Sequence, residues 1–212
     1  MSKLVLWGAS GHAKVVADIV RLAGEHEIVG FLDDVDPAAR NREFCGARVL
    51  GGRERLESLR AEGVSHVLFA FGDGAARLRL APYVRERGFE LATAIHPRAV
   101  VAADVVIGAG TVICAGAVVG PGTTLGENVI VNTLAGVDHD CAIGAGAHVA
   151  PGARLGGTVR VGEGAWVGIG AVVREKVSIG ERAVIGAGAV VLDDVASGIV
   201  AFGVPARPVR VG

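Results

Sequence analysis

The sequence has few aromatic side chains and no excess of either charge. Aromatic residues make up 4% of the 212 positions, and 21 basic residues are balanced by 22 acidic ones. No basic stripe is visible, so nucleic acid is not an expected partner. Hydrophobic residues still reach 51%, and 33 residues are glycine. We therefore expect a core of small and β-branched side chains, which suits tightly coiled, repetitive β structure better than an ordinary sandwich.

Cysteine and long apolar runs are also scarce. Cys45, Cys114 and Cys141 are odd in number and widely spaced, which is typical of small buried thiols rather than of a disulfide framework or a metal knuckle. The six histidines show no paired ligand spacing, so we expect no metal. The first apolar run spans about four residues, far below the roughly 20 that cross a bilayer, and it has no cleavage site. We expect a soluble, cytoplasmic protein with no membrane partner.

Residues 1–94 alternate between strand and helix patterns. Short apolar runs at KLVLWG, EIVGFLDD, VSHVLFAFGD and FELATAIHP predict strands. Helical spacing marks HAKVVADIVRLAG, RERLESLRAEG and ARLRLAPYVRERG, the last of which we expect to break or start near Pro82. Strands that alternate with helices form βαβ units and a parallel sheet. The sequence therefore predicts a Rossmann-like α/β domain over residues 1–94.

Residues 95–212 follow a period of six. Every sixth residue from Ile107 to Val191 is a branched aliphatic, fifteen in all, and nine of the residues that follow them are glycine. One side chain in six then points into a narrow prism, and three hexads complete one triangular coil. A single coil cannot bury its own face, so about five coils must stack. The pattern predicts a parallel β-helix and argues against an alternating antiparallel β protein.

Three segments of the first domain are candidates for one binding edge. Gly8-Ala9-Ser10-Gly11-His12 stands between a strand and a helix, where backbone N–H groups attract anions. Asp33 and Asp34 follow the second strand, about where an acidic residue meets a ribose, and Asp73 ends the third strand just before Arg77. A plain strand-to-helix turn explains Gly8 to His12 equally well, and an Asp-rich turn explains Asp33 and Asp34 equally well. NAD is a rival ligand, but the middle glycine of its fingerprint is missing.

The coil from Asn132 to Cys141 carries the candidate base. Val137 is an inward residue, so His139 projects outward between Asp138 and Asp140. A carboxylate can fix the tautomer of such a histidine and stabilise its imidazolium, which suits a general base. A solvated surface histidine is the alternative. No Cys–His pair or G-x-S-x-G motif is evident, so a one-step reaction is favoured over one that passes through a covalent enzyme intermediate.

Several motifs together resemble one family. The hexads resemble the [LIV]-G-x-x-x-x repeat of left-handed β-helix acyltransferases. The opening WGASGHAKVVADI, then FLDD, the junction AIHPRA, the coil NTLAGVDHDCAIGAGAHVAPGA and the ending AFGVPARPVR are similar to the PglD/NeuD-like bacterial sugar acyltransferases. The resemblance covers essentially the whole chain. It implies that a left-handed parallel β-helix follows the Rossmann-like domain along the chain.

The resemblance also implies roles for residues of the coils. It makes His139 the catalytic base and Asp140, where the family often has Glu, its orienting carboxylate. It places Asn132 against the substrate, His148 near the thioester or coenzyme, and a Gly157 N–H at the developing oxyanion. A tolerated turn residue is the alternative for Asn132, and an exposed or interface histidine is the alternative for His148.

The remaining implications concern ligands and assembly. The resemblance assigns Gly11, His12, Asp33, Asp34 and Asp73 to the nucleotide of a nucleotide-linked amino sugar. It implies a homotrimer with acetyl-CoA between neighbouring prisms. Candidates for contacts with the coenzyme are Trp166, Arg174, Lys176, Arg182 and the tail around Pro205, Ala206 and Arg207.

The function expected from these residues is N-acetylation of the 4-amino group of a nucleotide-linked 4-amino-4,6-dideoxy sugar. Acetyl-CoA is the co-substrate, and no metal takes part. O-acetylation of a sialic acid or related sugar, as in NeuD, is the alternative. A non-catalytic β-helix scaffold is a third reading, against which the His139-Asp140 pair argues. The sequence leaves UDP, GDP and dTDP open.

Overall fold

A computed structural model describes residues 1–209. Arg210, the last residue of the AFGVPARPVR ending, lies outside the described residues. The chain divides into two compact units, Met1–Pro97 and Arg98–Gly212. Within residues 1–209, no helix is long and apolar enough to cross a membrane.

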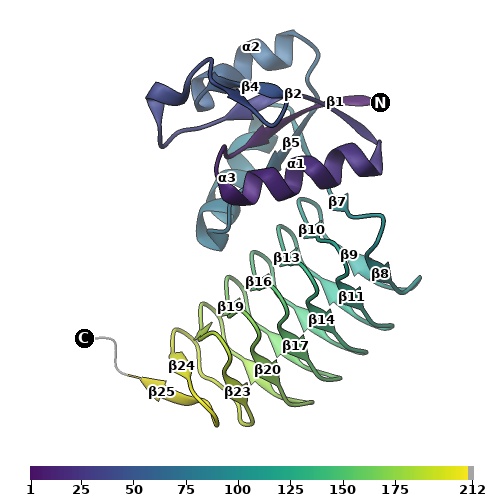
Figure 1. Ribbon diagram of the computed structural model, residues 1–212, viewed down its shortest axis with the longest axis vertical. Helices are drawn as coiled ribbons and strands as arrows, with labels where there is room; N and C mark the ends of the chain where they lie inside the picture. Colours follow the sequence, from purple (N-terminus) through teal and green to yellow (C-terminus); the bar gives the residue numbers. More distant parts are fainter. Residues whose placement is uncertain (210–212) are drawn as a thin grey trace. The chain divides into compact units, whose positions relative to one another are not determined.

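The N-terminal unit is an α/β domain built on a six-stranded sheet in the order β3-β4-β2-β1-β5-β6 (Figure 1). All pairings are parallel except β3 with β4. The α/β class and the parallel pairing of the predicted strands are confirmed. The elements are β1 (Ser2–Trp7), α1 (Gly11–Ala23), β2 (His26–Leu32), η1 (Pro37–Ala39), β3 (Glu43–Phe44), β4 (Ala47–Gly51), η2 (Arg53–Arg55), α2 (Leu56–Ala61), β5 (His66–Phe69), α3 (Gly74–Glu86), β6 (Glu90–Leu91) and β7 (Ala94–Ile95).

Two features of this unit differ from the sequence expectation. The sequence does not predict strands β3 and β4, because their apolar runs are short, Cys45 and Gly46 separate them and Arg48 interrupts β4. Helix α3 neither breaks nor starts at Pro82, which lies inside it. A proline removes one backbone hydrogen bond from a helix. Burial of Leu80, Ala81 and Val84 keeps α3 packed on both sides of that position.

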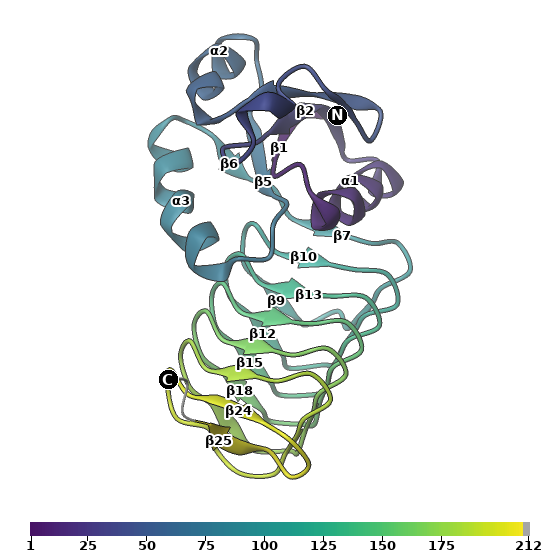
Figure 2. The same ribbon diagram turned by 60° about the vertical axis from the view of Figure 1, so that its left-hand side comes forward.

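The C-terminal unit is a left-handed β-helix with three sheets as its sides, whose strands pair in parallel except for the terminal pair β24 and β25 (Figures 1 and 2). The β14 face holds β8 (Val100–Val101), β11 (Val118–Val119), β14 (Gly136–Val137), β17 (Arg154–Leu155), β20 (Val172–Val173) and β23 (Val190–Val191). The β15 face holds β9 (Val106–Ile107), β12 (Thr124–Leu125), β15 (Ala142–Ile143), β18 (Arg160–Val161) and β21 (Ser178–Ile179). The β16 face holds β10 (Val112–Ile113), β13 (Ile130–Val131), β16 (His148–Val149), β19 (Trp166–Val167), β22 (Val184–Ile185), β24 (Val200–Phe202) and β25 (Arg207–Val209).

The period of six sets the register of the stacked coils. Val119 pairs with Val137, and Val137 pairs with Leu155, so each residue lies over the one eighteen positions later. Of the fifteen aliphatic positions, all are buried except Ile107, which is half-buried in the first coil. Val100 and Val101 of β8 already pair with β11, so the coils begin ahead of Ile107.

Candidate active site and nucleotide pocket

His139 lies in the turn that joins β14 to β15, at the corner between the β14 and β15 faces. Its imidazole is exposed, as the outward register predicts. The Asp138 carboxylate accepts a hydrogen bond from the His139 backbone N–H at 2.8 Å, and the Thr158 N–H donates to the His139 carbonyl at 2.8 Å. Both contacts hold the backbone of this turn in place. The side chain therefore projects from a fixed point on the prism.

Asp140 orients the imidazole. His139 Nδ1 lies 2.8 Å from Asp140 Oδ2, so the shorter Asp makes the contact for which the family often uses Glu. A carboxylate only accepts, so Nδ1 carries the proton and Nε2 keeps its lone pair. This hydrogen bond raises the pKa of His139 above its usual value, and the charge of Asp138 adds to the effect. Nε2 is therefore the atom that can take up a proton.

Gly157 lies directly beneath the His139 ring in the next coil. A Cβ at position 157 would lie 2.5 Å from Nε2 and 2.6 Å from Cε1 of His139, so only glycine leaves room for the ring. No described residue accepts a hydrogen bond from the Gly157 N–H. The amide is thus open to an oxyanion formed near Nε2.

A groove of about 510 Å³ runs along the β14 face beside this corner. Val118 and Val172 give it apolar walls, while Arg154 and Arg174 bring positive charge. Asp138 and Gly156, the neighbours of His139 and Gly157, also line it. An apolar arm with an anionic end fits such a surface.

Asn132 and His148 lie elsewhere in the prism. His148 belongs to β16, and Asn132 directly follows β13 of the same β16 face, which is opposite the corner that carries His139. Asn132 Nδ2 lies 3.0 Å from His148 Nε2, and the His148 ring packs on Trp166 with centroids 4.2 Å apart. Both side chains are buried. Within one chain, therefore, these two residues do not join His139.

The N-terminal unit has its own pocket of about 530 Å³. Its lining includes Trp7 to Ser10 from the turn before α1, and Phe71 after β5. Gly8 has φ 127°, and a Cβ there would lie 2.8 Å from the Ala70 carbonyl, so the turn requires glycine. In the described chain the Ser10 side chain does not cap α1, and the first turn has no acidic residue. The N–H groups that open α1 therefore remain suited to an anion.

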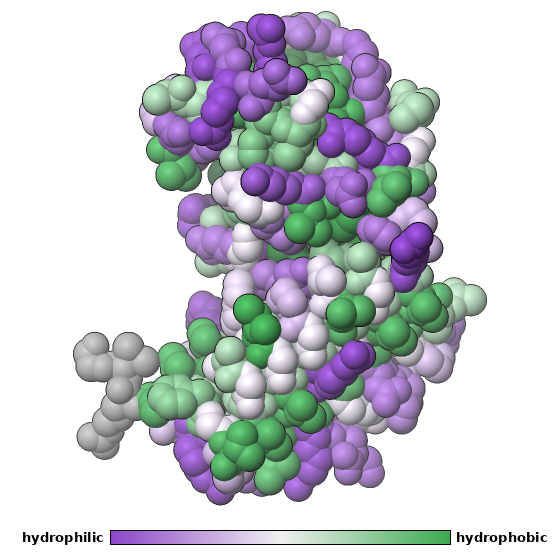
Figure 3. Space-filling view, viewed as in Figure 1, coloured by the Kyte–Doolittle hydropathy of each residue, from purple (hydrophilic) through white to green (hydrophobic). Residues whose placement is uncertain are grey.

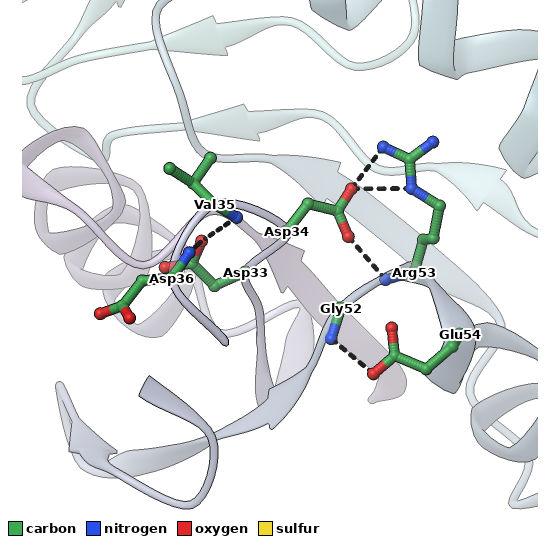
Figure 4. A network of polar contacts seen from close by, with 7 residues as sticks. All are labelled: Asp33, Asp34, Val35, Asp36, Gly52, Arg53 and Glu54. Atoms are coloured by element: carbon green, nitrogen blue, oxygen red, sulfur yellow. Dashed lines mark hydrogen bonds and ion pairs between the residues drawn. The ribbon is translucent and has the colours of Figure 1, made fainter. Parts of the chain in front are cut away.

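The pocket also holds an ion pair that the sequence did not suggest (Figure 4). The Arg53 side chain donates to Asp34 Oδ2 from Nε at 2.9 Å and from Nη2 at 2.6 Å, and the Arg53 N–H donates to Oδ1 at 2.8 Å. Its guanidinium lies 5.8 Å from the Trp7 ring centroid and 5.9 Å from that of Tyr83. In the sequence, the position of Arg53 directly after a glycine pair at the end of β4 could have marked it as a pocket residue.

The other predicted nucleotide residues have varied placements. Asp33 lines the pocket, whereas Gly11 is the exposed first residue of α1. Asp73 caps α3 by accepting the Ala76 N–H at 3.0 Å. His12 is half-buried, and this burial, with the nearby charge of Arg77, lowers its pKa to about 4.

The candidate coenzyme residues are scattered. Arg174 lines the groove on the β14 face, and Lys176 lies in the corner turn below Gly157. Trp166 belongs to the β16 face, and Arg182 lies in the turn between β21 and β22. In the tail, the Ala206 N–H donates to the Val190 carbonyl, and Arg207 pairs with Asp193 at 3.7 Å. Among residues 1–209, no group of three His, Cys, Asp or Glu side chains is arranged to hold a metal.

Two family models match the chain, the PglD N-terminal domain over residues 3–84 and the bacterial transferase hexapeptide repeat over residues 158–193. A histidine-to-alanine mutant of GDP-perosamine N-acetyltransferase from Caulobacter crescentus, solved with CoA and GDP-perosamine, is 39% identical. That match covers 99% of this chain and 98% of that chain, with a TM-score of 0.94. The chain belongs to the PglD/NeuD-like family of bacterial sugar acyltransferases.

A second solved member of the PglD/NeuD-like family supports the same comparison. The acetyltransferase domain of PglB from Neisseria gonorrhoeae, in complex with acetyl coenzyme A, is 40% identical. The match covers 98% of both chains, with a TM-score of 0.91. Both relatives are acetyltransferases, and the Caulobacter enzyme is an N-acetyltransferase, so the O-acetylating reading of the NeuD kind is not favoured.

Proposed function

We propose that this protein transfers an acetyl group from acetyl-CoA to the 4-amino group of a nucleotide-linked 4-amino-4,6-dideoxy sugar. The observation that carries the proposal is His139, held by Asp140 with Nε2 directly over Gly157. The relatives support the choice of substrates, since one binds CoA and GDP-perosamine and the other binds acetyl-CoA. Perosamine is itself a 4-amino-4,6-dideoxy sugar.

The chemical step follows from the arrangement of these groups. The sugar amine attacks the thioester carbon of acetyl-CoA while its proton passes to His139 Nε2. The charge that develops on the carbonyl oxygen is stabilised by the Gly157 N–H. The tetrahedral intermediate then collapses, the C–S bond breaks, and the departing thiolate takes the proton from the imidazolium. Asp140 stabilises that imidazolium throughout.

The groove on the β14 face is the proposed seat of the coenzyme. Its valine walls suit the pantetheine arm, and Arg154 and Arg174 suit the phosphates of the nucleotide end. An acyl group bound there reaches the corner at Gly156 and Asp138, next to the catalytic pair. The sequence candidate Arg174 is supported by this placement.

We propose that a homotrimer completes the site. His139 lies on the corner opposite the face with Asn132 and His148, so one prism cannot bring them together. A neighbouring copy can place its β16 face against that corner, and a ring of three closes the contacts. Exposed apolar side chains support self-association, because Val100 is 64% exposed and Val118 is 42% exposed. Figure 3 shows apolar side chains on the surface of the β-helix.

The N-terminal pocket is the proposed seat of the nucleotide. The turn at Ala9 and Ser10, which leads into α1, offers N–H groups to the diphosphate, and the ends of β2 and β4 surround the nucleoside. Gly11, His12 and Asp73 remain part of the proposal as residues that shape this edge. Asp73 acts through the cap of α3, and the burial of His12 favours a packing role.

Replacing His139 tests the proposal. His139→Asn keeps a polar amide near the place of Nδ1 but removes Nε2, the proposed base, so kcat should fall about 10²- to 10⁴-fold. Thiol release from acetyl-CoA with GDP- and UDP-linked 4-amino sugars measures the rate, and circular dichroism checks the fold. Undiminished acetyl transfer by a folded variant would refute the role of His139 as the base. Transfer to sialic acid but not to any amino sugar would favour O-acetylation instead.

A further inference from the structure

Asp140 holds the imidazole of His139 through one of its two oxygens. Oδ2 lies 2.8 Å from His139 Nδ1, whereas no group within residues 1–209 donates a hydrogen bond to Oδ1. The Asp140 side chain is also 65% exposed, so burial does not fix its rotamer. A packing contact is therefore needed to limit where this carboxylate lies.

Gly122, in the preceding coil, supplies that contact. A Cβ at position 122 would lie 2.6 Å from Oδ1 and 3.5 Å from Cγ of Asp140. Non-bonded heavy atoms prefer about 3.5 Å, so a methyl group there would push Oδ1 back by roughly 1 Å. Glycine at this position leaves the space in which Oδ1 rests while Oδ2 faces the imidazole.

The backbone conformation alone does not require glycine at position 122. Gly122 has φ 70°, in the left-handed region. The residues at the same corner in the next three coils also have positive φ, and none of them is glycine: Asp140 at 57°, Thr158 at 64° and Lys176 at 63°. This corner therefore accepts side chains, and the space needed by Asp140 gives a reason for glycine that the turn itself does not.

The turn that contains Gly122 is tied to the coils on both sides. The Gly122 N–H donates to Asp104 Oδ2 at 3.0 Å, and the Pro121 carbonyl accepts the Asp140 N–H at 2.9 Å. The Asp140 carboxylate is, by contrast, the exposed end of a side chain. A collision between the two would therefore move the carboxylate and leave the coil in place.

We propose that Gly122 is a positioning residue, which sets the Asp140 carboxylate against His139 Nδ1 and so fixes the tautomer of the imidazole. It acts through Asp140 rather than on the reacting atoms. The inference rests on the proposed function, because it takes His139 as a base whose Nε2 must keep its lone pair. It gives a role in the reaction to a coil that carries none of the residues assigned to the chemical step.

The charges around His139 define what a titration can report. Asp138 and Asp140 belong to its own turn, Asp104 belongs to an earlier coil, and Glu175 and Lys176 belong to a later one. The hydrogen bond from Asp140 is the largest influence that raises the pKa of His139. Losing this bond should therefore lower the pKa of His139 even though every charge remains.

Nuclear magnetic resonance of the histidine side chains in the full chain tests the inference, with His139→Asn used to assign the signal. Gly122→Ala should lower the pKa of His139 and leave its neutral form as a mixture of the two tautomers. In the same variant kcat should fall about 10- to 100-fold, with the acidic limb of its pH profile at lower pH. Gly188→Ala is the matched control, because Gly188 has φ 68° and a Cβ there meets no atom within 4 Å. It imposes the same backbone strain and should leave the pKa, the tautomer and kcat unchanged.

A double variant asks whether Gly122 acts through Asp140. Gly122→Ala combined with Asp140→Asn should have the same kcat as Asp140→Asn alone, because the contact is already lost. A double variant whose loss in kcat is the product of the two single losses would overturn the positioning role. An equal loss in Gly122→Ala and Gly188→Ala would also overturn it, since backbone strain would then be the cause.

Gly122→Asn keeps the test decisive if alanine disturbs the fold. Asparagine tolerates the left-handed region better than alanine and places the same Cβ, so it should give the same change in tautomer. Failure of both Gly122 variants to fold, beside a folded Gly188→Asn, would overturn the inference and make Gly122 a residue of the fold alone.

The magnetic resonance readout does not depend on turnover, which separates this inference from the proposed function. A changed tautomer in Gly122→Ala, in a protein that acetylates no amino sugar, would support the contact and overturn only the proposed function. An unchanged tautomer and an unchanged kcat in Gly122→Ala, beside an inactive His139→Asn, would overturn only the inference about Gly122.

Discussion

Adding a single methyl group at Gly157 is expected to displace His139, the proposed catalytic base, without unfolding the protein. The new Cβ of Gly157→Ala would lie 2.5 Å from Nε2, 2.6 Å from Cε1 and 3.1 Å from Cδ2 of His139. Non-bonded carbon contacts prefer about 3.5 Å, so the ring must move by about 1 Å. A misplacement of that size costs about 10²-fold in rate. We therefore expect kcat to fall about 10²-fold with little change in KM.

The stability of Gly157→Ala should change little. The backbone at position 157 is not in the left-handed region, so alanine fits it without strain. The atoms that must move belong to the exposed end of a flexible side chain, which can rotate towards solvent. The free energy of unfolding should stay within about 0.5 kcal/mol of the wild type, as for an ordinary surface substitution.

Gly170→Ala is the matched control. Its φ is 65°, and a Cβ there meets no atom within 4 Å, so this alanine strains the backbone but touches no side chain. It should cost about 1–2 kcal/mol of stability and leave kcat unchanged. Steady-state thiol release and thermal unfolding measure both variants. A Gly157→Ala enzyme with wild-type kcat would refute the argument that Nε2 accepts the proton from its position over residue 157.

Three other predictions follow from the same geometry. Because Asp140 raises the pKa of His139, the imidazole is neutral only above that raised value. Asp140→Asn should therefore lower kcat and move the acidic limb of its pH profile to lower pH. An unmoved limb would contradict the orienting contact. Mixing His139→Ala chains with Asn132→Ala chains should restore about one quarter of wild-type activity if each site uses both residues from different subunits, and no recovery would argue for a site within one chain. Ile185→Ala, at a fully buried inward position, should cost about 2–5 kcal/mol in chemical denaturation, and a smaller loss would mean that the coil collapses around the cavity.

The family assignment and the local geometry support each other. Two acetyltransferases are 39–40% identical across nearly the whole chain, which fixes the class of reaction. The His139–Asp140 contact of 2.8 Å then shows that this chain can present a base with a fixed tautomer.

The sequence by itself determined the prism and the outward direction of His139. A hexad repeat is a local property, and each inward aliphatic is followed by its stacking partner eighteen residues later, so the register could be counted. The same count places Gly157 under His139. The strands and helices of the first domain followed from their apolar spacing, apart from the short β3 and β4.

Only the tertiary structure decided which side chains contact one another on this backbone. The approach of the ring to Gly157 depends on a rotamer that Asp140 selects. The contact of Asn132 with His148 joins two stacked coils and depends on the rotamers of both side chains. The pairing of Asp34 with Arg53 joins the ends of two neighbouring strands. A repeat or a motif describes one segment of the chain, whereas these contacts join two segments. Spacing along the chain therefore cannot specify them.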